Sequence, residues 1–275
     1  MTVTSVFHVS DLHFGQPAVP AQIDAIAMLI QEQKYDIVAI SGDVSQRARS
    51  GEFQRARAFL RHAEEVSRTI VVPGNHDVAW WKAPLGFGDG KARYANYRAY
   101  VSPDLEPVLR VPGATFIGIN TAHGVTRHTL TWRLRDISII GYVNRAQIER
   151  MSREFDASPP GDRRIIVMHH NPVKGELSKR HGLKNTRKVL GAFAENAVDV
   201  VLCGHDHQEA IHYIEHTRRG TVISTAGTVS NRSRGGRPSS VNIIRMAERS
   251  IDVSTLIWAA DSQSFVAGRS RRFED

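Results

Sequence analysis

The order of apolar segments constrains the fold of this chain more than any other feature of its sequence. Near the N-terminus, short apolar runs alternate with longer segments in which apolar residues recur at helical spacing. The runs cover residues 3–10, 36–41 and 69–72, and the amphipathic segments between them cover 21–33 and 52–66. Strands that are apolar on both faces and alternate with helices are typical of a buried parallel sheet. We therefore predict an α/β fold.

The pattern continues and then changes in the last third of the chain. Further strands are expected at 115–121, 163–170 and 198–204, with helices near 145–156 and 186–197. From residue 210 to residue 259, strand candidates follow one another with little room for helices. That density indicates an antiparallel section or a second sheet. We expect one domain over residues 1–275, with a core at about 3–258, two sheets covered by helices, and a short basic C-terminal tail.

Composition narrows the class of protein and of partner. With 275 residues, 41% of them hydrophobic and 23% charged, the sequence is typical of a globular protein. No apolar run is long enough for a membrane helix, and the first one is too short for a signal peptide. The single cysteine, Cys203, excludes an intramolecular disulfide and favours the cytoplasm. A formal charge of +8 fits an anionic partner such as a phosphate ester, nucleic acid or an acidic surface, or merely a basic surface.

Five of the expected strands end in turns that carry carboxylate, amide or imidazole groups. Singly, such turns are ordinary polar loops, but the carboxyl ends of strands in an α/β sheet face a common crevice. Oxygen and nitrogen ligands without thiolate suit Mn, Fe or Zn. The polar side chains of the five turns are too many to bind one tetrahedral ion. They are enough to bind two ions that share a carboxylate and activate a bridging water. The side chains are Asp11 and His13, Asp43, Asn75 and His76, His169 and His170, and His205 and His207.

In chain order these turns read DLH, GD, GNHD, HHNP and GHDH, a set that resembles the calcineurin-like metallophosphoesterases. Within that family, the sequence is most similar to bacterial enzymes related to class III cyclic nucleotide phosphodiesterases. The resemblance covers residues 7 to about 207. It implies two mixed β-sheets packed together and flanked by helices, an αββα sandwich, and two divalent metal ions (Mn, Fe or Zn) as cofactors.

The resemblance also implies a role for each position. The first metal would be held by Asp11, His13 and His207, and Asp43 would bridge both ions. The second metal would be held by Asn75, His169 and His205. His76 would be the catalytic residue that donates to a phosphate oxygen or to the leaving alkoxide. His169 is preferred to His170 because it directly follows the apolar run of its strand, and Asp77 would orient either His76 or a turn.

The predicted function is hydrolysis of a small phosphodiester, of the cyclic nucleotide or glycerophosphodiester class, by a metal-bridging hydroxide. A phosphomonoesterase or a nuclease on the same centre, and a non-catalytic scaffold, are the alternatives. The expected partner is a small anionic phosphoester; nucleic acid is less favoured, no membrane is expected, and a homo-oligomer stays open. Two arginine groups lie beside predicted strand ends and could contact substrate: Arg47 with Arg49, and Arg232 with Arg234 and Arg237.

Overall fold

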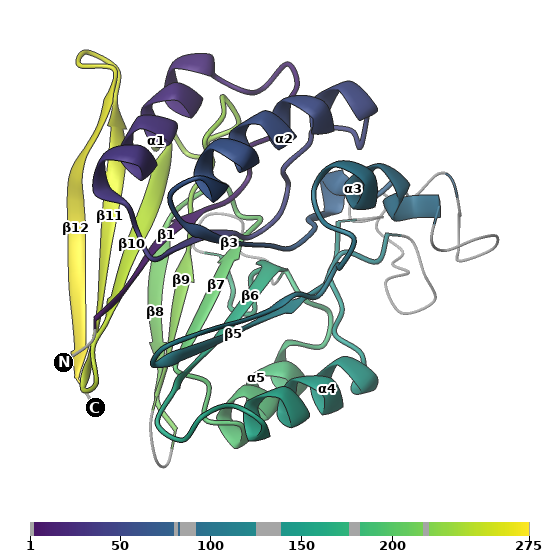
Figure 1. The fold of residues 1–275 in the computed structure, drawn as a ribbon, viewed down its shortest axis with the longest axis vertical. Coiled ribbons are helices and arrows are strands. Elements are labelled where there is room, and N and C mark those ends of the chain that lie inside the picture. The colour runs from purple at the N-terminus through teal and green to yellow at the C-terminus, as the bar shows by residue number, and fades with distance from the viewer. Residues whose placement is uncertain are drawn as a thin grey trace.

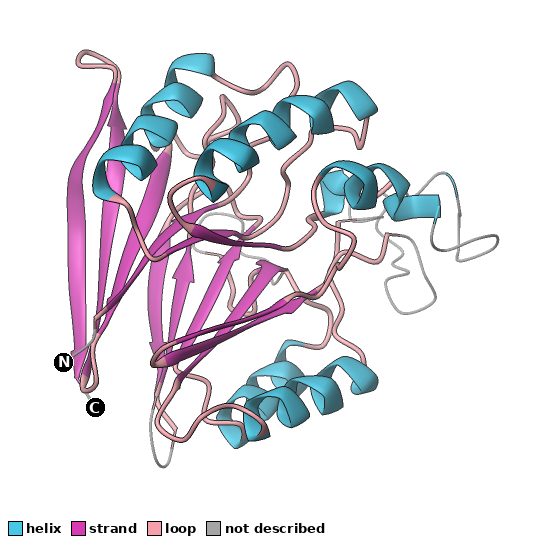
Figure 2. Ribbon diagram, viewed as in Figure 1, coloured by secondary structure: helices cyan, strands magenta, loops and turns pink. Residues whose placement is uncertain are grey.

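The computed structural model describes residues 3–79, 82, 92–124, 139–175, 182–216 and 220–274. Two six-stranded mixed sheets pack face to face, with helices on the outer side of each (Figure 1). Figure 2 shows the same four layers as helix, strand, strand and helix. The α/β sandwich predicted from the sequence is therefore confirmed.

The first sheet has the order β12-β11-β10-β1-β2-β3. β1, β2 and β3 run parallel, whereas β10 pairs antiparallel with β1 and continues into the antiparallel β11 and β12. Its strands are β1 (Thr4–Val9), β2 (Ile37–Ile40), β3 (Arg68–Val71), β10 (Ser240–Met246), β11 (Ser250–Ala259) and β12 (Ser264–Glu274). The helices α1 (Pro20–Gln33) and α2 (Ser50–Glu64) cover its outer face through an apolar layer that includes Ile26, Ile30 and Leu60.

The second sheet has the order β4-β5-β6-β7-β9-β8. Its inner strands are parallel, and β4 and β8 close the two edges in antiparallel pairs. Its strands are β4 (Val108–Val111), β5 (Ala114–Ile119), β6 (Arg163–His170), β7 (Val200–Gly204), β8 (Ala210–Ile214) and β9 (Thr221–Thr225). The helices α4 (Arg145–Asp156) and α5 (Thr186–Glu195) cover its outer face with Phe155 and Phe193.

The inner faces of the two sheets form a common apolar core. Val6, Ile37 and Ile70 of the first sheet belong to the same buried cluster as Phe116 and Val167 of the second. Every residue of β2, β5 and β7 is buried, so these strands pack on both faces. The continuous apolar runs in the sequence have this cause. Among the described helices, none combines the length and hydropathy that a membrane-spanning segment requires.

Four elements differ from the prediction. Residues 264–274, expected in the short basic tail, form the edge strand β12, whose charged and exposed side chains hide the strand pattern. The edge strand β4 follows a segment, 83–107, for which the sequence indicates no helix or strand. That segment contains a 3₁₀ turn, η4 (Ala92–Tyr94), and α3 (Ala95–Tyr100), whereas 83–91 lie outside the described residues. Short elements of this kind carry too few residues for a periodic pattern.

Candidate metal centre

The polar turns of both sheets meet at one edge of the sandwich. Turns after β1, β2 and β3 hold Asp11, Asp43 and Asn75, the carboxyl end of β6 holds His169, and the turn after β7 holds His205. The backbone of several of these residues lies in the left-handed region, which non-glycine residues seldom adopt and which is often found at functional sites. The φ angles are 55° at Asp11, 47° at His13, 51° at Asp43, 73° at His205 and 55° at His207.

Two glycines make this close approach of turns possible. A Cβ on Gly74 would lie 2.2 Å from both the amide nitrogen and Oδ1 of Asp43. A Cβ on Gly204 would lie 1.9 Å from Oγ of Ser10 and 2.5 Å from Oδ2 of Asp11. Any larger residue would push the carboxylates away, so the two positions require glycine for space.

One group of potential ligands consists of Asp11, His13, Asp43 and His207. One ligand atom from each lies within 4.8 Å of the others, and all four residues are buried. Oδ1 of Asp11 is 3.1 Å from Nε2 of His207 and 3.6 Å from Nε2 of His13. Nε2 of His13 is 3.2 Å from Nε2 of His207 and 3.9 Å from Oδ2 of Asp43. This spacing could hold a metal ion.

A second group adjoins the first through Asp43. Oδ2 of Asp43, which is 3.9 Å from Nε2 of His13, is also 3.4 Å from Nε2 of His169. Nε2 of His169 is 3.1 Å from Oδ1 of Asn75. Nδ1 of His205 is 3.1 Å from the same oxygen and 3.3 Å from Nε2 of His169. Asp43 therefore lies between two sets of oxygen and nitrogen atoms.

The hydrogen bonds around the centre leave lone pairs directed into it. Nδ1–H of His169 donates to the carbonyl of Ser41 (2.8 Å), and Nδ1–H of His207 donates to the carbonyl of Arg232 (3.0 Å). As metal ligands the two rings would be neutral, with Nε2 as an acceptor. Oδ1 of Asp11, which faces Nε2 of His207, has no hydrogen-bond partner among the described residues despite its burial. Imidazoles oriented by carbonyls, beside a buried oxygen without a donor, fit a divalent cation.

The pKa values show how strongly the charges interact. Burial alone would raise the pKa of Asp43, but the rings of His169 and His76 lower it well below its usual range. Burial opposes protonation of His169, but the Asp43 carboxylate outweighs it and raises the pKa of His169 to about 9. Burial and His169 lower the pKa of His205 to about 3. The carboxylates thus attract positive charge, which a metal ion would supply in place of a proton.

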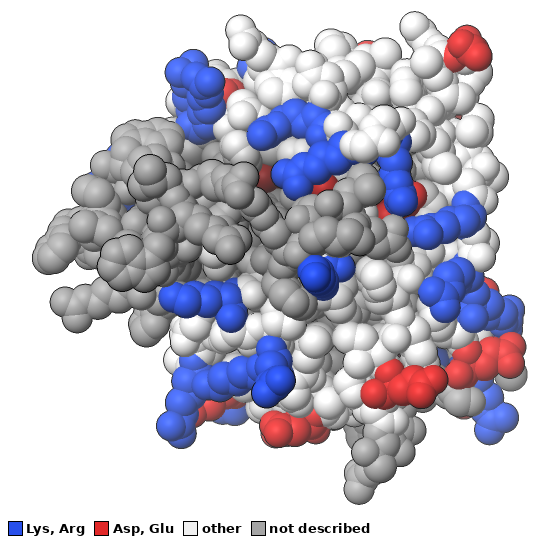
Figure 3. Space-filling model, turned by 180° about the vertical axis from the view of Figure 1, so that it is seen from behind, with Lys and Arg blue, Asp and Glu red and all other residues white. Residues whose placement is uncertain are grey.

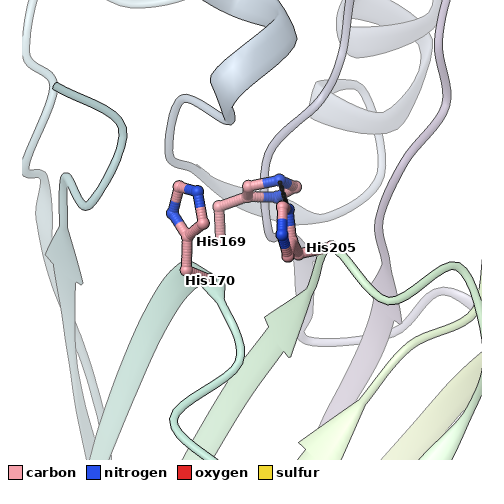
Figure 4. Close-up of side chains that lie close together, drawn as sticks. All are labelled: His169, His170 and His205. Atoms are coloured by element: carbon pink, nitrogen blue, oxygen red, sulfur yellow. Dashed lines mark hydrogen bonds between the residues drawn. The ribbon is translucent and has the colours of Figure 1, made fainter. Parts of the chain in front are cut away.

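His169 and His170 differ in what their ring nitrogens contact. The imidazoles of His169, His170 and His205 are close enough for a metal group (Figure 4). However, Nδ1 of His170 is 2.7 Å from Oγ1 of Thr121, and its Nε2–H donates to the carbonyl of Ile139 at 2.8 Å. Both nitrogens of His170 are occupied, whereas Nε2 of His169 faces Asn75. We therefore retain His169 as the proposed ligand. The ring of His170 packs against that of His205, with 4.6 Å between the ring centroids.

His76 lies beside the first group and is held from three sides. Its amide donates to Oδ1 of Asp43 (2.8 Å), and its Nδ1–H donates to the carbonyl of Gln46 (2.8 Å). Nε2 of the ring accepts from the guanidinium of Arg232 (3.1 Å), and the ring packs edge-on against His13 at 4.9 Å. His76 is thus fixed next to the centre, and its Nε2 contacts the Arg232 guanidinium rather than an atom of a proposed metal ligand.

Asp77 supports the backbone of two turns. Its carboxylate accepts hydrogen bonds from the amides of Val44, Ser45 and Gly74, at 2.7 to 3.1 Å, and from the hydroxyl of Ser45. Burial and the charge of Asp43 raise the pKa of Asp77 to about 7, and these donors oppose the rise. Asp77 therefore orients turn backbone, which is one of the two roles expected for it.

A family model for the calcineurin-like phosphoesterases matches residues 4–209. The chain belongs to that family. No curated protein matches the sequence significantly. Members of this family bind divalent metals, and the cluster of Asp and His side chains at this edge of the sandwich could hold a metal.

Two solved structures have the same fold at low sequence identity. A purple acid phosphatase, PPD1, from yellow lupin (Lupinus luteus) superposes with a TM-score of 0.70 at 12% identity, over 99% of this chain and 54% of that one. The chain therefore spans about half the length of the plant phosphatase. GAP50 of Plasmodium, described as the anchor in the inner membrane complex, has a TM-score of 0.60 at 13% identity, over 100% of this chain and 89% of that one.

Sequence reasoning missed the residues that hold His169 and His170 in their orientations. Ser41 and Thr121 act through a carbonyl and a hydroxyl, which no motif identifies. Arg232 stood out only as part of an arginine-rich loop. Its carbonyl holds His207 and its guanidinium contacts His76, so the loop after β9 belongs to the centre.

Proposed function

We propose that this calcineurin-like phosphoesterase is a two-metal phosphodiesterase that hydrolyses a small phosphodiester of the cyclic nucleotide or glycerophosphodiester class. The observation that carries the proposal is the position of Asp43. Its Oδ2 lies 3.9 Å from Nε2 of His13 in one group and 3.4 Å from Nε2 of His169 in the other. A carboxylate between two sets of oxygen and nitrogen donors suits two cations held close together.

Each side chain then has a separate task. Asp11, His13 and His207 would hold one cation, and Asn75, His169 and His205 the other, with Asp43 shared. Two such cations, when bound, lower the pKa of a water molecule and polarise phosphoryl oxygens. His76 carries no ligand role. It is held next to the ligands by Gln46 and Asp43. Its Nε2 would exchange the Arg232 guanidinium for a phosphate oxygen or the leaving alkoxide and assist proton transfer there.

The test is hydrolysis of bis(p-nitrophenyl) phosphate by protein loaded with Mn, Fe, Zn or Co, with the metal content of the same samples measured. We expect about two ions per chain and activity that chelation abolishes. His76→Ala should keep the metals and lose about 10²–10⁴-fold in kcat. His62→Ala is the matched control, because the His62 side chain on α2 is 43% exposed and its ring lies 3.8 Å from the carboxylate of Glu65, away from the proposed ligands. Inactivity with all four metals would overturn the proposal.

A monoesterase is the second candidate, because its chemistry needs the same centre and a purple acid phosphatase has the same fold. The ratio of kcat/KM for bis(p-nitrophenyl) phosphate to that for p-nitrophenyl phosphate separates the two. We expect two loops, 83–107 and 122–140, to set this choice, and both lie partly outside the described residues.

A nuclease and a scaffold have weaker support. On the face drawn in Figure 3, the basic side chains of the described residues lie in separate groups rather than along one continuous track. A long polyanion needs many neighbouring phosphate contacts.

The fold also occurs in GAP50, an anchor, so fold alone does not establish catalysis. The full set of oxygen and nitrogen donors favours an enzyme over a scaffold. Location in the cytoplasm stays a sequence prediction.

A further inference from the structure

A basic cavity of about 620 Å³ adjoins the proposed metal centre. Its walls come from the loop after β1, the loop after β2 and the first turns of α2. We call it the arginine cavity, because Arg47, Arg49 and Arg55 all line it. Gln46, in the loop after β2, and Glu52, on α2, also line the cavity.

The three guanidinium groups are available to a ligand. All three residues are exposed, and none of the three side chains forms an ion pair with another described residue. Glu52 is the carboxylate in the walls, and it accepts hydrogen bonds from the amides of Arg47 (2.7 Å) and Arg49 (3.2 Å). Its charge is thus directed to the backbone at the start of α2. The guanidinium donors meet solvent inside a concave, net positive surface.

Gln46 connects this cavity to the centre. Its side chain lines the cavity, and its Oε1 accepts a hydrogen bond from the guanidinium of Arg232 at 3.2 Å. The same guanidinium contacts Nε2 of His76, and the carbonyl of Gln46 accepts from Nδ1–H of that ring. A single residue therefore separates the cavity from the group proposed to meet the scissile phosphate. The cavity therefore lies next to His76, with Gln46 and Arg232 between them.

We infer that the arginine cavity binds a second phosphate group of the substrate, adjacent to the phosphodiester that is cleaved. This inference rests on the proposed function and narrows the substrate to a diester that carries a further phosphate. Guanidinium groups suit this task, because they bind phosphate oxygens through charge-assisted, bidentate hydrogen bonds. The second phosphate could belong to a phosphorylated small diester or to the neighbouring linkage of a short oligonucleotide.

The test compares two chromogenic diesters that differ by one phosphate: thymidine 5′-(p-nitrophenyl phosphate) and its 3′-phosphorylated derivative. We expect the metal-loaded protein to show a KM about 10-fold lower for the phosphorylated compound, the size of effect that one charged hydrogen bond gives. The preference should weaken as salt concentration rises. An equal KM for the two compounds, with both hydrolysed, would overturn the inference.

Variants assign the effect to the cavity. Arg47→Gln, Arg49→Gln and Arg55→Gln, singly and combined, should raise KM for the phosphorylated compound and leave hydrolysis of bis(p-nitrophenyl) phosphate unchanged. Arg61→Gln is the matched control, because Arg61 is an exposed arginine on the same helix and outside the cavity. A loss of the preference in Arg61→Gln as well would indicate a general charge effect and contradict the inference.

Two further measurements separate the sources and the causes of failure. Similar kcat/KM values for the 3′-phosphorylated thymidine diester and for the dinucleotide pTpT would indicate a small substrate. A kcat/KM that rises with chain length up to a tetranucleotide would indicate nucleic acid. If bis(p-nitrophenyl) phosphate is not hydrolysed, the proposed function has failed. Calorimetric binding of thymidine 3′,5′-bisphosphate against thymidine 5′-monophosphate then still tests the cavity, and equal affinities would refute it.

Discussion

Replacing Gly74 by alanine tests whether the centre depends on the close packing of two turns. Gly74 has φ −99° and ψ −179°, a conformation that alanine adopts without strain. The added methyl would lie 2.2 Å from the amide nitrogen and from Oδ1 of Asp43, whereas ordinary contacts begin at 3.4 Å. The two turns must therefore separate by about 1 Å, and a misplacement of that size typically costs about 10²-fold in rate.

The assay measures three quantities for Gly74→Ala: the free energy of unfolding in urea, the metal content, and kcat/KM for bis(p-nitrophenyl) phosphate. We expect a loss of about 1–3 kcal/mol in stability from overpacking, and a loss of metal or a rate lower by about 10²-fold. Gly191→Ala is the matched control, since Gly191 lies on α5 with nothing within 4 Å of an added Cβ. That control should gain up to about 1 kcal/mol and keep its activity. Wild-type metal content and rate in folded Gly74→Ala would refute the role given to Gly74.

Four further predictions concern ligand choice, stability, thiol reactivity and the pH dependence of stability. His169→Ala should lose one metal ion per chain and His170→Ala should retain both; metal loss with His170→Ala alone would reverse the assignment. Asp199→Ala removes the partner of Arg163 (2.8 Å) at the far end of β6, so urea unfolding should show a loss of about 3–5 kcal/mol at unchanged metal content. Burial raises the pKa of Cys203 to about 12, so native protein at pH 8 should react with iodoacetamide about 10³-fold more slowly than unfolded protein. The folded state also keeps this proton above the ordinary pKa of 9.0, so stability should fall as pH rises beyond it.

The sheets and the ligand turns could be predicted because both leave local patterns. Strands buried on two faces, such as β5 and β7, appear as continuous apolar runs. The motif residues directly follow such runs, so predicting where each strand ends also predicted where the motif residues lie. Edge strands carry no such pattern: β12 is exposed and rich in arginine, and it appears as a tail until its pairing with β11 is known.

The residues that orient the ligands could not be predicted, because they act across long sequence separations. Ser41 holds His169 through a backbone carbonyl, which every residue type provides. Arg232 reaches His76 from 156 positions away. The difference between His169 and His170 likewise depends on Thr121, which only the packing of β5 beside β6 brings into contact.

The proposed ligands are divided between the two sheets, and this has a consequence for folding. Asp11, His13, Asp43 and Asn75 follow strands of the first sheet, whereas His169, His205 and His207 belong to the second. Each group of ligands takes members from both sheets, so neither sheet can assemble a centre before the two have docked. Ions held there would act as cross-links over the seam between the sheets. At a free metal concentration 100 times the dissociation constant, metal binding would stabilise the docked sheets by about 2.7 kcal/mol per site.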